Sequence, residues 1–186
     1  MDIYQAIEKR RTVRLFVQGV SEKALHKILL AGTKALSARN SQPWEFIHVD
    51  DSKLIDQIAE HKYQQNLERF SQEESLKQKK AYKNCSVVAV CYKEGQAVSA
   101  WTCIQNMALA ATAEGLGILP STFWGEHQKA VEKLLGLPEG YNLATVMLIG
   151  VQEGYPNTDY PKPPRRQEFS WLHRNRFGVA HDQVNS

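Results

Sequence analysis

Three arginines and a threonine lie within five residues near the start of the chain, in the segment Arg10-Arg11-Thr12-Val13-Arg14. Arginine presents a planar fork of N–H donors that matches the oxygens of a phosphate, and threonine adds a hydroxyl donor. If the chain is extended here, Arg10, Thr12 and Arg14 project to the same side. The segment therefore predicts a binding site for an anion, with a solvated basic turn as the alternative.

A second basic segment, Pro163-Pro164-Arg165-Arg166, lies near the other end of the sequence. The two prolines stiffen the approach to the arginines, which suits delivery of charge to a fixed place. An exposed basic tail is the alternative. Both ends of the chain carry an excess of positive charge, although its formal net charge is only +3. We expect either that the two ends repel each other or that an anion lies between them.

Two further segments suit contact with a flat ligand. The polar loop 37–43 leads into an apolar run that begins at Trp44, and its backbone and amide donors suit the edge of a cofactor. Residues 115–125 contain three glycines, which let a backbone approach a ligand closely. This glycine segment matches neither G-x-x-x-x-G-K-[ST] nor G-x-G-x-x-G. An ordinary loop and a helix end followed by a connector are the respective alternatives.

The sequence shows no pattern typical of metal or thiol chemistry. Its three cysteines include no C-x-x-C spacing, and its six histidines form no ligand spacing with Asp or Glu. We expect no bound metal, reduced buried cysteines, and histidines that are structural or at the surface.

Composition excludes several classes of protein. The 186 residues are 42% hydrophobic and 23% charged, which is typical of one compact domain. No apolar run approaches the roughly 20 residues of a membrane span, and no secretory signal is visible. The net charge is too small to argue for nucleic-acid binding. We therefore expect a cytoplasmic protein that is not fibrous, membrane-spanning, secreted or disordered.

Hydrophobic periodicity predicts the elements that position these segments. Expected helices span residues 2–10, 21–36, 52–61, 99–114 and 126–135, and expected strands span 44–49, 86–92 and 143–151. Residues 62–84 are rich in Gln, Lys and Glu and predict an exposed helical excursion, with a mobile lid as its suggested role. Helices outweigh strands, so we expect an α+β fold in which helices cover a sheet. One domain is expected over 1–178, with a tail over 179–186.

Together these segments resemble the nitroreductase family of FMN-dependent oxidoreductases. Residues 10–16 are similar to the family signature Arg-Arg-Ser-x-Arg-x-Phe, with Thr12 in the serine position. Residues 37–46 are similar to Ser-x-x-Asn-x-Gln-Pro-Trp-x-Phe. The resemblance covers residues 2–176. It implies a central, mostly antiparallel sheet flanked by helices, in an intertwined homodimer with helix 99–114 at the interface.

The resemblance implies which residues hold the phosphate end of FMN. Arg10 and Arg166, with Arg165, would grip the phosphate, and Thr12 would help to hold it. Arg11 would reach the ribityl chain or the flavin ring.

Several segments would surround the flavin ring. Arg14 would lie near the N1–C2=O edge, and Asn66 and Arg69 would face the pyrimidine side. The partner subunit would supply Ser37, Ala38 and Asn40, and Arg39 of the same loop is also expected to bind the cofactor. The backbone of Pro120, Ser121 and Thr122 would pass the N5 edge. The side chains expected to border the substrate are Phe123 and Trp124.

The sequence departs from the family pattern at three places. Leu36 replaces the proline that usually precedes the loop serine, and Arg39 occupies a position that is often small. Arg39 is expected to reshape the substrate mouth in favour of an acidic substrate or the phosphate of NADPH. The segment after Gly117 lacks the sequence pattern Pro-x-Gly-x-Phe that is common in the family.

The resemblance implies a ping-pong cycle. NADH or NADPH would give hydride to flavin N5, and a nitroaromatic, a quinone or a related small electrophile would then discharge the flavin. The cofactor would carry the chemistry, so no catalytic side chain is expected. Alternatives are a specialised family branch (reductive dehalogenation, enoate reduction or flavin breakdown), a non-catalytic flavin-binding protein and, less well supported, a basic nucleic-acid module.

Overall fold

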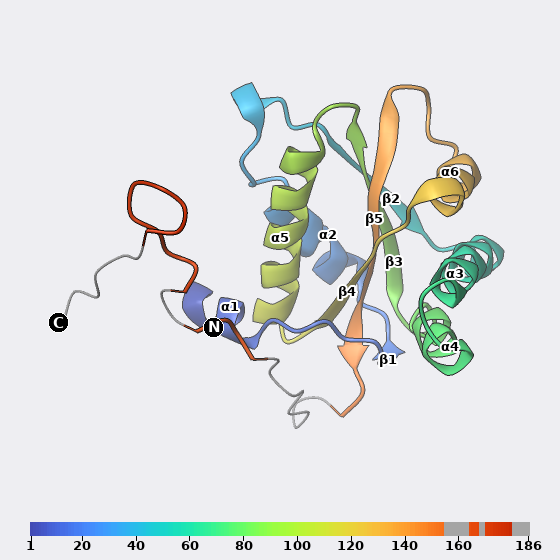
Figure 1. The fold of residues 1–186 in the computed structure, drawn as a ribbon. Coiled ribbons are helices and arrows are strands. Elements are labelled where there is room, and N and C mark those ends of the chain that lie inside the picture. Colours follow the sequence, from blue (N-terminus) through green and yellow to red (C-terminus); the bar gives the residue numbers. More distant parts are fainter. Residues whose placement is uncertain (155–163, 168–169, 180–186) are drawn as a thin grey trace.

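A five-stranded sheet forms the centre of the computed structural model, which describes residues 1–154, 164–167 and 170–179 (Figure 1). The strands are β1 (Phe16–Gln18), β2 (Trp44–Val49), β3 (Ser86–Lys93), β4 (Gly117–Ser121) and β5 (Tyr141–Gln152). Their order is β1-β5-β3-β2, with β4 also paired to β5, and all of these pairings are antiparallel. The expected α+β fold with a mostly antiparallel sheet flanked by helices is confirmed.

Helices cover both faces of this sheet. One layer contains α1 (Ile3–Lys9), α2 (Glu22–Gly32) and α5 (Ala97–Ala113), and the other contains α3 (Ser52–Leu67), α4 (Gln72–Lys80) and α6 (Gly125–Leu134) (Figure 1). Along β3, Val87 and Ala89 pack into the core on the α3 and α6 side, whereas Val88 and Val90 pack against α2 and α5. This alternation has the period of two expected of a strand. Because both faces are apolar, β3 is buried throughout most of its length.

The expected helices and strands are present, with boundaries that differ by a few residues, and strand 44–49 has the expected bounds. The two short strands β1 and β4 were not expected. β4 lies within segment 115–125, for which the sequence predicts a glycine-rich approach to a ligand or a helix end followed by a connector. The segment is a strand because Ile118 and Leu119 are buried and pair with β5.

Residues 62–84 are helical over much of their length, as expected, and many are exposed, but the segment is not a wholly exposed excursion. α3 continues to Leu67, and Lys62, Gln65, Asn66 and Ser75 are buried. Ala81 and Tyr82 join the hydrophobic core. Lys62 and Gln65 are buried with hydrogen bonds to residues 122–124, a contact between segments distant in sequence that composition does not reveal.

No described helix is both long and apolar enough to span a membrane. The predicted tail over 179–186 lies outside the described residues apart from Val179.

We expect Gly117→Ala to destabilise the fold by about 1–3 kcal/mol, the usual cost of overpacking a core. A Cβ atom at Gly117 would lie 2.9 Å from both Cβ and Cγ2 of Val13. Chemical denaturation measures the free energy of unfolding. The same glycine substitution should cost less in a Val13→Ala background, where both methyl groups are gone. Equal costs in the two backgrounds would show that the methyl groups of Val13 do not limit the packing.

Candidate functional site

The basic segment near the N-terminus leaves α1 and runs beside β4. Arg10 ends the helix with extended ψ (123°), Thr12 forms a parallel bridge with Ile118, and the Val13 N–H donates to Ile118 O at 3.0 Å. Val13 is buried, so the alternation of an extended chain directs Thr12 and Arg14 to the other side. β4 therefore determines where the arginine segment lies.

Arg10 and Arg165 come together from opposite ends of the chain. Partial burial lowers the pKa of Arg10, and the positive charges of Arg11 and Arg165 lower it further. None of the ion pairs among the described residues involves Arg10 or Arg165. Like charges at close range repel unless an anion lies between them. The cluster therefore has the electrostatic character of an anion site.

The neighbouring arginines are held by backbone carbonyls. Arg11 Nη1 donates to Glu8 O and to Arg10 O, both at 2.7 Å, and so caps the C-terminal end of α1. Arg166 Nη2 donates to Ser170 O at 2.8 Å. The structure thus brings Arg165 rather than Arg166 into electrostatic contact with Arg10. The cofactor roles of Arg11 and Arg166 stay predictions.

Helix α3 holds the segment that follows β4. Lys62 Nζ donates to Thr122 O at 2.8 Å, and Gln65 Nε2 donates to the same oxygen at 3.2 Å. Gln65 Oε1 also accepts from Trp124 N at 2.9 Å. Lys62 is only 6% exposed, and burial lowers its pKa to about 8. Sequence reasoning missed Lys62 and Gln65; their spacing of three on one helix face was the available signal.

Cations also lie over the indole ring of Trp124. Lys62 Nζ is 5.1 Å and Arg69 Cζ is 4.4 Å from the ring centroid. Both distances lie within the range of cation–π attraction. Arg69 and Trp124, which were predicted to contact the cofactor and the substrate respectively, therefore lie together.

Asn66 carries a buried donor with no partner. Its side-chain Nδ2 has no hydrogen-bond acceptor among the described residues, although the residue is only 1% exposed. Leaving such a donor unsatisfied costs about 1–3 kcal/mol. A ligand carbonyl that accepts from this amide would remove that cost, which agrees with the predicted role of Asn66.

The side chains at the end of β4 face the core. The Tyr82 hydroxyl donates to Ser121 Oγ at 2.7 Å, and burial raises the pKa of Tyr82. The Phe123 side chain lies within the hydrophobic core on the α3 and α6 side. A ligand beside this segment therefore meets the backbone of residues 120–123 and the ring of Trp124. The substrate role predicted for Phe123 stays a prediction and concerns a buried ring.

The loop 37–42 lies at the opposite end of α5 from α1 (Figure 1). Arg39, Asn40 and Gln42 have φ values of 53°, 56° and 46°, a region that is strained for residues with a side chain. Ser37 Oγ accepts from Gln42 N at 3.1 Å and stabilises the loop. The 17 residues of α5 span about 25 Å. Within one chain, residues 37–40 therefore do not reach the arginine cluster.

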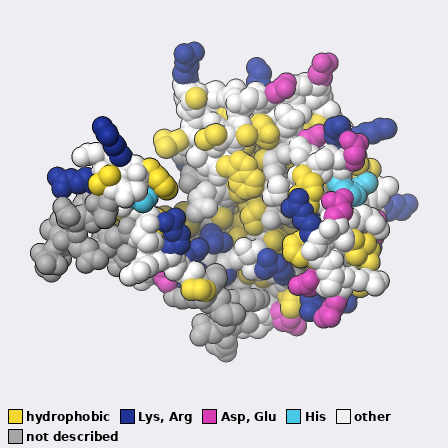
Figure 2. All heavy atoms as spheres, in the orientation of Figure 1, with side chains coloured by type: hydrophobic (Ala, Val, Ile, Leu, Met, Phe, Trp, Pro, Cys, Tyr) yellow, Lys and Arg dark blue, Asp and Glu magenta, His cyan; other side chains and the backbone are white. Residues whose placement is uncertain are grey.

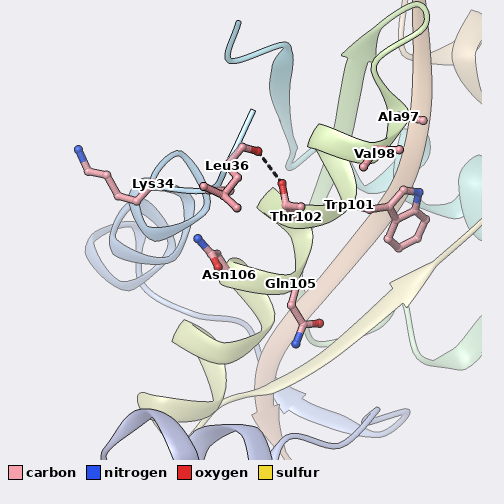
Figure 3. A pocket seen from close by; sticks show the side chains of 9 residues that line it. Lys34, Leu36, Ala97, Val98, Trp101, Thr102, Gln105 and Asn106 are labelled. Carbon is pink, nitrogen blue, oxygen red and sulfur yellow. Dashed lines mark hydrogen bonds between the residues drawn. The ribbon is translucent and has the colours of Figure 1, made fainter. Parts of the chain in front are cut away.

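An open groove of about 750 Å³ lies between the end of α2 and the outer face of α5 (Figure 3). Leu36 and Val98 are 84% and 80% exposed, and Trp101 is partly exposed beside them. Thr102 Oγ1 donates to Leu36 O at 2.8 Å and holds the loop against the helix. The remaining lining residues are Lys34, Ala35, Ala97, Gln105 and Asn106.

One face of the molecule combines an apolar surface with cations. Figure 2 shows hydrophobic side chains gathered in the middle of this face, with Lys and Arg side chains to either side. The elements in front here are α5 and β4 (Figure 1). Such a surface suits a flat ring that carries an anionic tail.

Thiol and metal chemistry have no support in the described part of the chain. Burial raises the pKa of Cys85, Cys91 and Cys103 to about 12 in each case, so none is a thiolate near neutral pH. No group of three or more His, Cys, Asp or Glu side chains among the described residues is placed to hold a metal ion.

A sequence model of the nitroreductase family matches residues 7–155. The chain belongs to this family. It is 29% identical over 182 residues to an iodotyrosine deiodinase of Thermotoga neapolitana, with 89% of this chain and 94% of that protein covered. It is also 29% identical over 185 residues to an Archaeoglobus fulgidus protein named as an NADH dehydrogenase/NAD(P)H nitroreductase, with 89% and 96% covered.

A solved structure shows the same fold as this nitroreductase-family chain. It is the crystal structure of oxidised iodotyrosine deiodinase bound to FMN and 3-iodo-L-tyrosine. The TM-score is 0.73 at 24% identity, with 92% of this chain and all of that chain covered. Family membership supports an oxidoreductase, and the resemblance inferred from the two signatures is confirmed.

The buried ammonium of Lys62 should make the stability of this nitroreductase-family protein depend on pH above 8. The pKa of Lys62 is about 8 in the folded chain and about 10.5 when the side chain is free. Between these values the unfolded chain binds more protons, so raising the pH favours the folded state.

We expect the free energy of unfolding of the native protein, relative to Lys62→Met, to rise by about 2–3 kcal/mol from pH 8 to 10.5, since one pKa unit is worth about 1.4 kcal/mol and titration is incomplete at both ends of the range. Urea denaturation across this range measures it. Lys53→Met, at an exposed position in the same helix, should show no such rise. A constant difference between the native protein and Lys62→Met would contradict a buried, titrating ammonium.

Proposed function

We propose that this chain is an FMN-dependent oxidoreductase that takes hydride from NADH or NADPH and reduces small electrophilic acceptors such as nitroaromatics or quinones. The convergence of Arg10 and Arg165 carries this proposal, because neither arginine has an ion-pair partner among the described residues and the segment that follows Arg10 runs beside β4. The NAD(P)H nitroreductase name of the Archaeoglobus relative and the FMN in the deiodinase structure support it.

The residues present fit FMN in two independent ways. Arg10 and Arg165, with the Thr12 hydroxyl, would hold the phosphate, since a paired arginine site matches a doubly charged anion. The unpartnered amide of Asn66 would donate to a carbonyl on the pyrimidine part of the ring. The apolar face would cover the rest of the ring system.

Bound FMN supplies the redox chemistry, and its N5 accepts and returns hydride. The protein's part is to orient and to stabilise charge. Arg14 and Arg69 are the cations available to stabilise negative charge at the N1–C2=O edge. By analogy with oxyanion-hole donors, one such fixed donor is worth about 2.7–4 kcal/mol. The backbone after β4, held by α3, would border N5.

The complete site would require an intertwined homodimer. Residues 37–40, which carry the second signature, lie at the far end of α5 from the arginines. A second copy packed along α5 would cover Leu36, Val98 and Trp101 and bring its own loop to the site. We assign the activity to the cytoplasm, where free thiols such as Cys85 stay reduced.

Reductive dehalogenation is the second candidate function. The observation that favours it is the identity of 29% to a protein named iodotyrosine deiodinase over nearly the whole chain. Both functions use the same cofactor site and differ in the acceptor that discharges the reduced cofactor. A panel of acceptors therefore separates them.

We expect the purified protein to be yellow, with flavin absorbance bands that bleach when NADH or NADPH is added without oxygen. The bands should return with a nitroaromatic or a quinone. Absorbance spectroscopy in a sealed cuvette measures both steps, and a halogenated phenol added to the reduced protein tests the second candidate. Protein that stays colourless after addition of FMN would refute the proposal, and bands that never bleach would indicate another electron donor.

We expect Arg10→Ala to weaken FMN binding about 10- to 100-fold, because hydrogen bonds to charged groups contribute about 1.5–3 kcal/mol. Arg165→Ala should have a similar effect, and Arg166→Ala tests the role predicted for that residue. Fluorescence titration of apoprotein with FMN measures the dissociation constant. Lys53→Ala removes the same charge at an exposed site in α3 and serves as the control. Unchanged affinity in both Arg10→Ala and Arg165→Ala would refute the phosphate site.

A further inference from the structure

Lys62 is a buried cation that neither the family signatures nor the proposed chemistry accounts for. It lies one turn before Asn66 on α3 and forms none of the ion pairs among the described residues. Its Nζ donates to Thr122 O and lies 5.4 Å and 5.1 Å from the ring centroids of Phe123 and Trp124. Burying an ammonium without a carboxylate partner is costly. The burial of this ammonium therefore indicates that Lys62 has a functional role.

Lys62 and Gln65 act on one peptide group. Both side chains donate to the carbonyl of Thr122, and Gln65 also accepts from the N–H of Trp124. Three hydrogen bonds from a single helix thus hold the two peptide groups on either side of Phe123. Two donors on one carbonyl fix the plane of the Thr122–Phe123 peptide more tightly than one donor does.

The orientation of that peptide has a consequence for its N–H group. In a trans peptide the carbonyl and the following N–H point in opposite directions. Because the Thr122 carbonyl points to α3, the Phe123 N–H points away from α3. The ladder between β4 and β5 ends at Ser121, and the Phe123 N–H has no acceptor within residues 1–154 or the described C-terminal segments. The clamp therefore directs a free backbone donor outward.

Resting on the proposed function, we infer that Lys62 and Gln65 are positioning residues that aim the Phe123 N–H at the N5 side of the flavin, where the C4 carbonyl shares the negative charge of the reduced ring. A donor fixed before the charge develops stabilises it without reorganisation. Backbone donors also leave room for a flat ring, since they carry no side chain into the site. The positive charge of Lys62 behind the same peptide strengthens the dipole.

A positioning role for Lys62 and Gln65 would affect the affinity for reduced FMN and the affinity for oxidised FMN to different extents. Removing the clamp should weaken the affinity for reduced FMN more than that for oxidised FMN, because the donor matters most once the edge is charged. For Lys62→Met we expect about a tenfold larger loss for reduced FMN, which corresponds to a fall of about 30 mV in the two-electron potential. Dye-equilibrated reduction of the FMN-loaded protein measures this potential.

Two further variants test whether the effect of Lys62 comes from positioning the Thr122 carbonyl, from its positive charge or from packing. Lys62→Gln keeps an N–H donor for Thr122 O without the charge, so it should restore more than half of the shift seen in Lys62→Met. Gln65→Leu should lower the potential in the same direction. Lys53→Met, exposed on the same helix, is the control for loss of a lysine and should keep the native potential.

Amide hydrogen exchange of the apoprotein gives a readout that needs no cofactor. Peptides covering residues 117–126 should exchange at least several-fold faster in Lys62→Met and in Gln65→Leu, whereas peptides covering β3 should be unchanged. This measurement also shows whether each variant is folded.

The outcomes are decisive for this inference. An unchanged potential in Lys62→Met, a Lys62→Gln variant that equals Lys62→Met, or unchanged exchange over 117–126 would each overturn the positioning role. If the native protein itself binds no FMN, the proposed function fails instead, and the exchange measurement still tests whether Lys62 and Gln65 hold the segment.

Discussion

The antiparallel pairing of β4 with β5 is the contact on which the candidate site depends. β4 has five residues, yet it positions both parts of the site. At Ile118 its carbonyl accepts from Val13 N–H and so holds the arginine segment. Just past its end, the Thr122 carbonyl accepts from α3. A slip of one residue in this pairing would turn every side chain of β4 to the other face. The buried residues of β5 oppose such a slip, because Val146, Leu148 and Ile149 would lose their packing.

The site also accumulates positive charge that the described part of the chain does not neutralise. Arg10 faces Arg165, and Lys62 is buried against two aromatic rings and a carbonyl. Each arrangement is unfavourable for a protein alone, because desolvated charge without a counter-charge opposes folding. Cation–π contacts and the carbonyl offset part of that cost for Lys62. An uncompensated desolvation cost of this kind is typical of sites where a bound ligand supplies the missing counter-charge.

Much of the fold follows from sequence, and the exceptions have physical causes. The apolar run from Trp44 is long enough to identify β2, and its bounds agree with the structure. β4 escaped prediction because glycine and proline in a short segment look like a loop, whereas pairing with β5 makes it a strand. The burial of Lys62, Gln65, Asn66 and Ser75 within segment 62–84 was not predicted, because it depends on contacts with residues distant in sequence. Propensity and periodicity describe neighbours along the chain and do not describe such contacts.

Part of the candidate site could likewise be predicted from the sequence, and part could not. The arginine signature was visible in the sequence, and the extended path that places Thr12 opposite Val13 is the one that alternation predicts. The choice between Arg165 and Arg166 as the neighbour of Arg10 was not visible. It depends on which of the two neighbouring side chains turns toward Arg10, and Arg166 instead donates to Ser170 O. Lys62 and Gln65 share a helix face, but nothing in the sequence identifies their partner, because it is a backbone carbonyl that any residue would offer.

Dimerisation and completion of the site are coupled in the arrangement proposed above. α5 spans about 25 Å, and the two signature segments lie at its opposite ends. One protomer therefore cannot place both against one ring, whereas two antiparallel copies can do so twice. The apolar side chains Leu36, Val98 and Trp101 line the groove at the 37–42 end. A second copy that buries them would therefore also place its own loop 37–42 at the site. Cofactor that binds across such an interface stabilises the dimer by mass action, and dimer formation in turn tightens the binding of the cofactor.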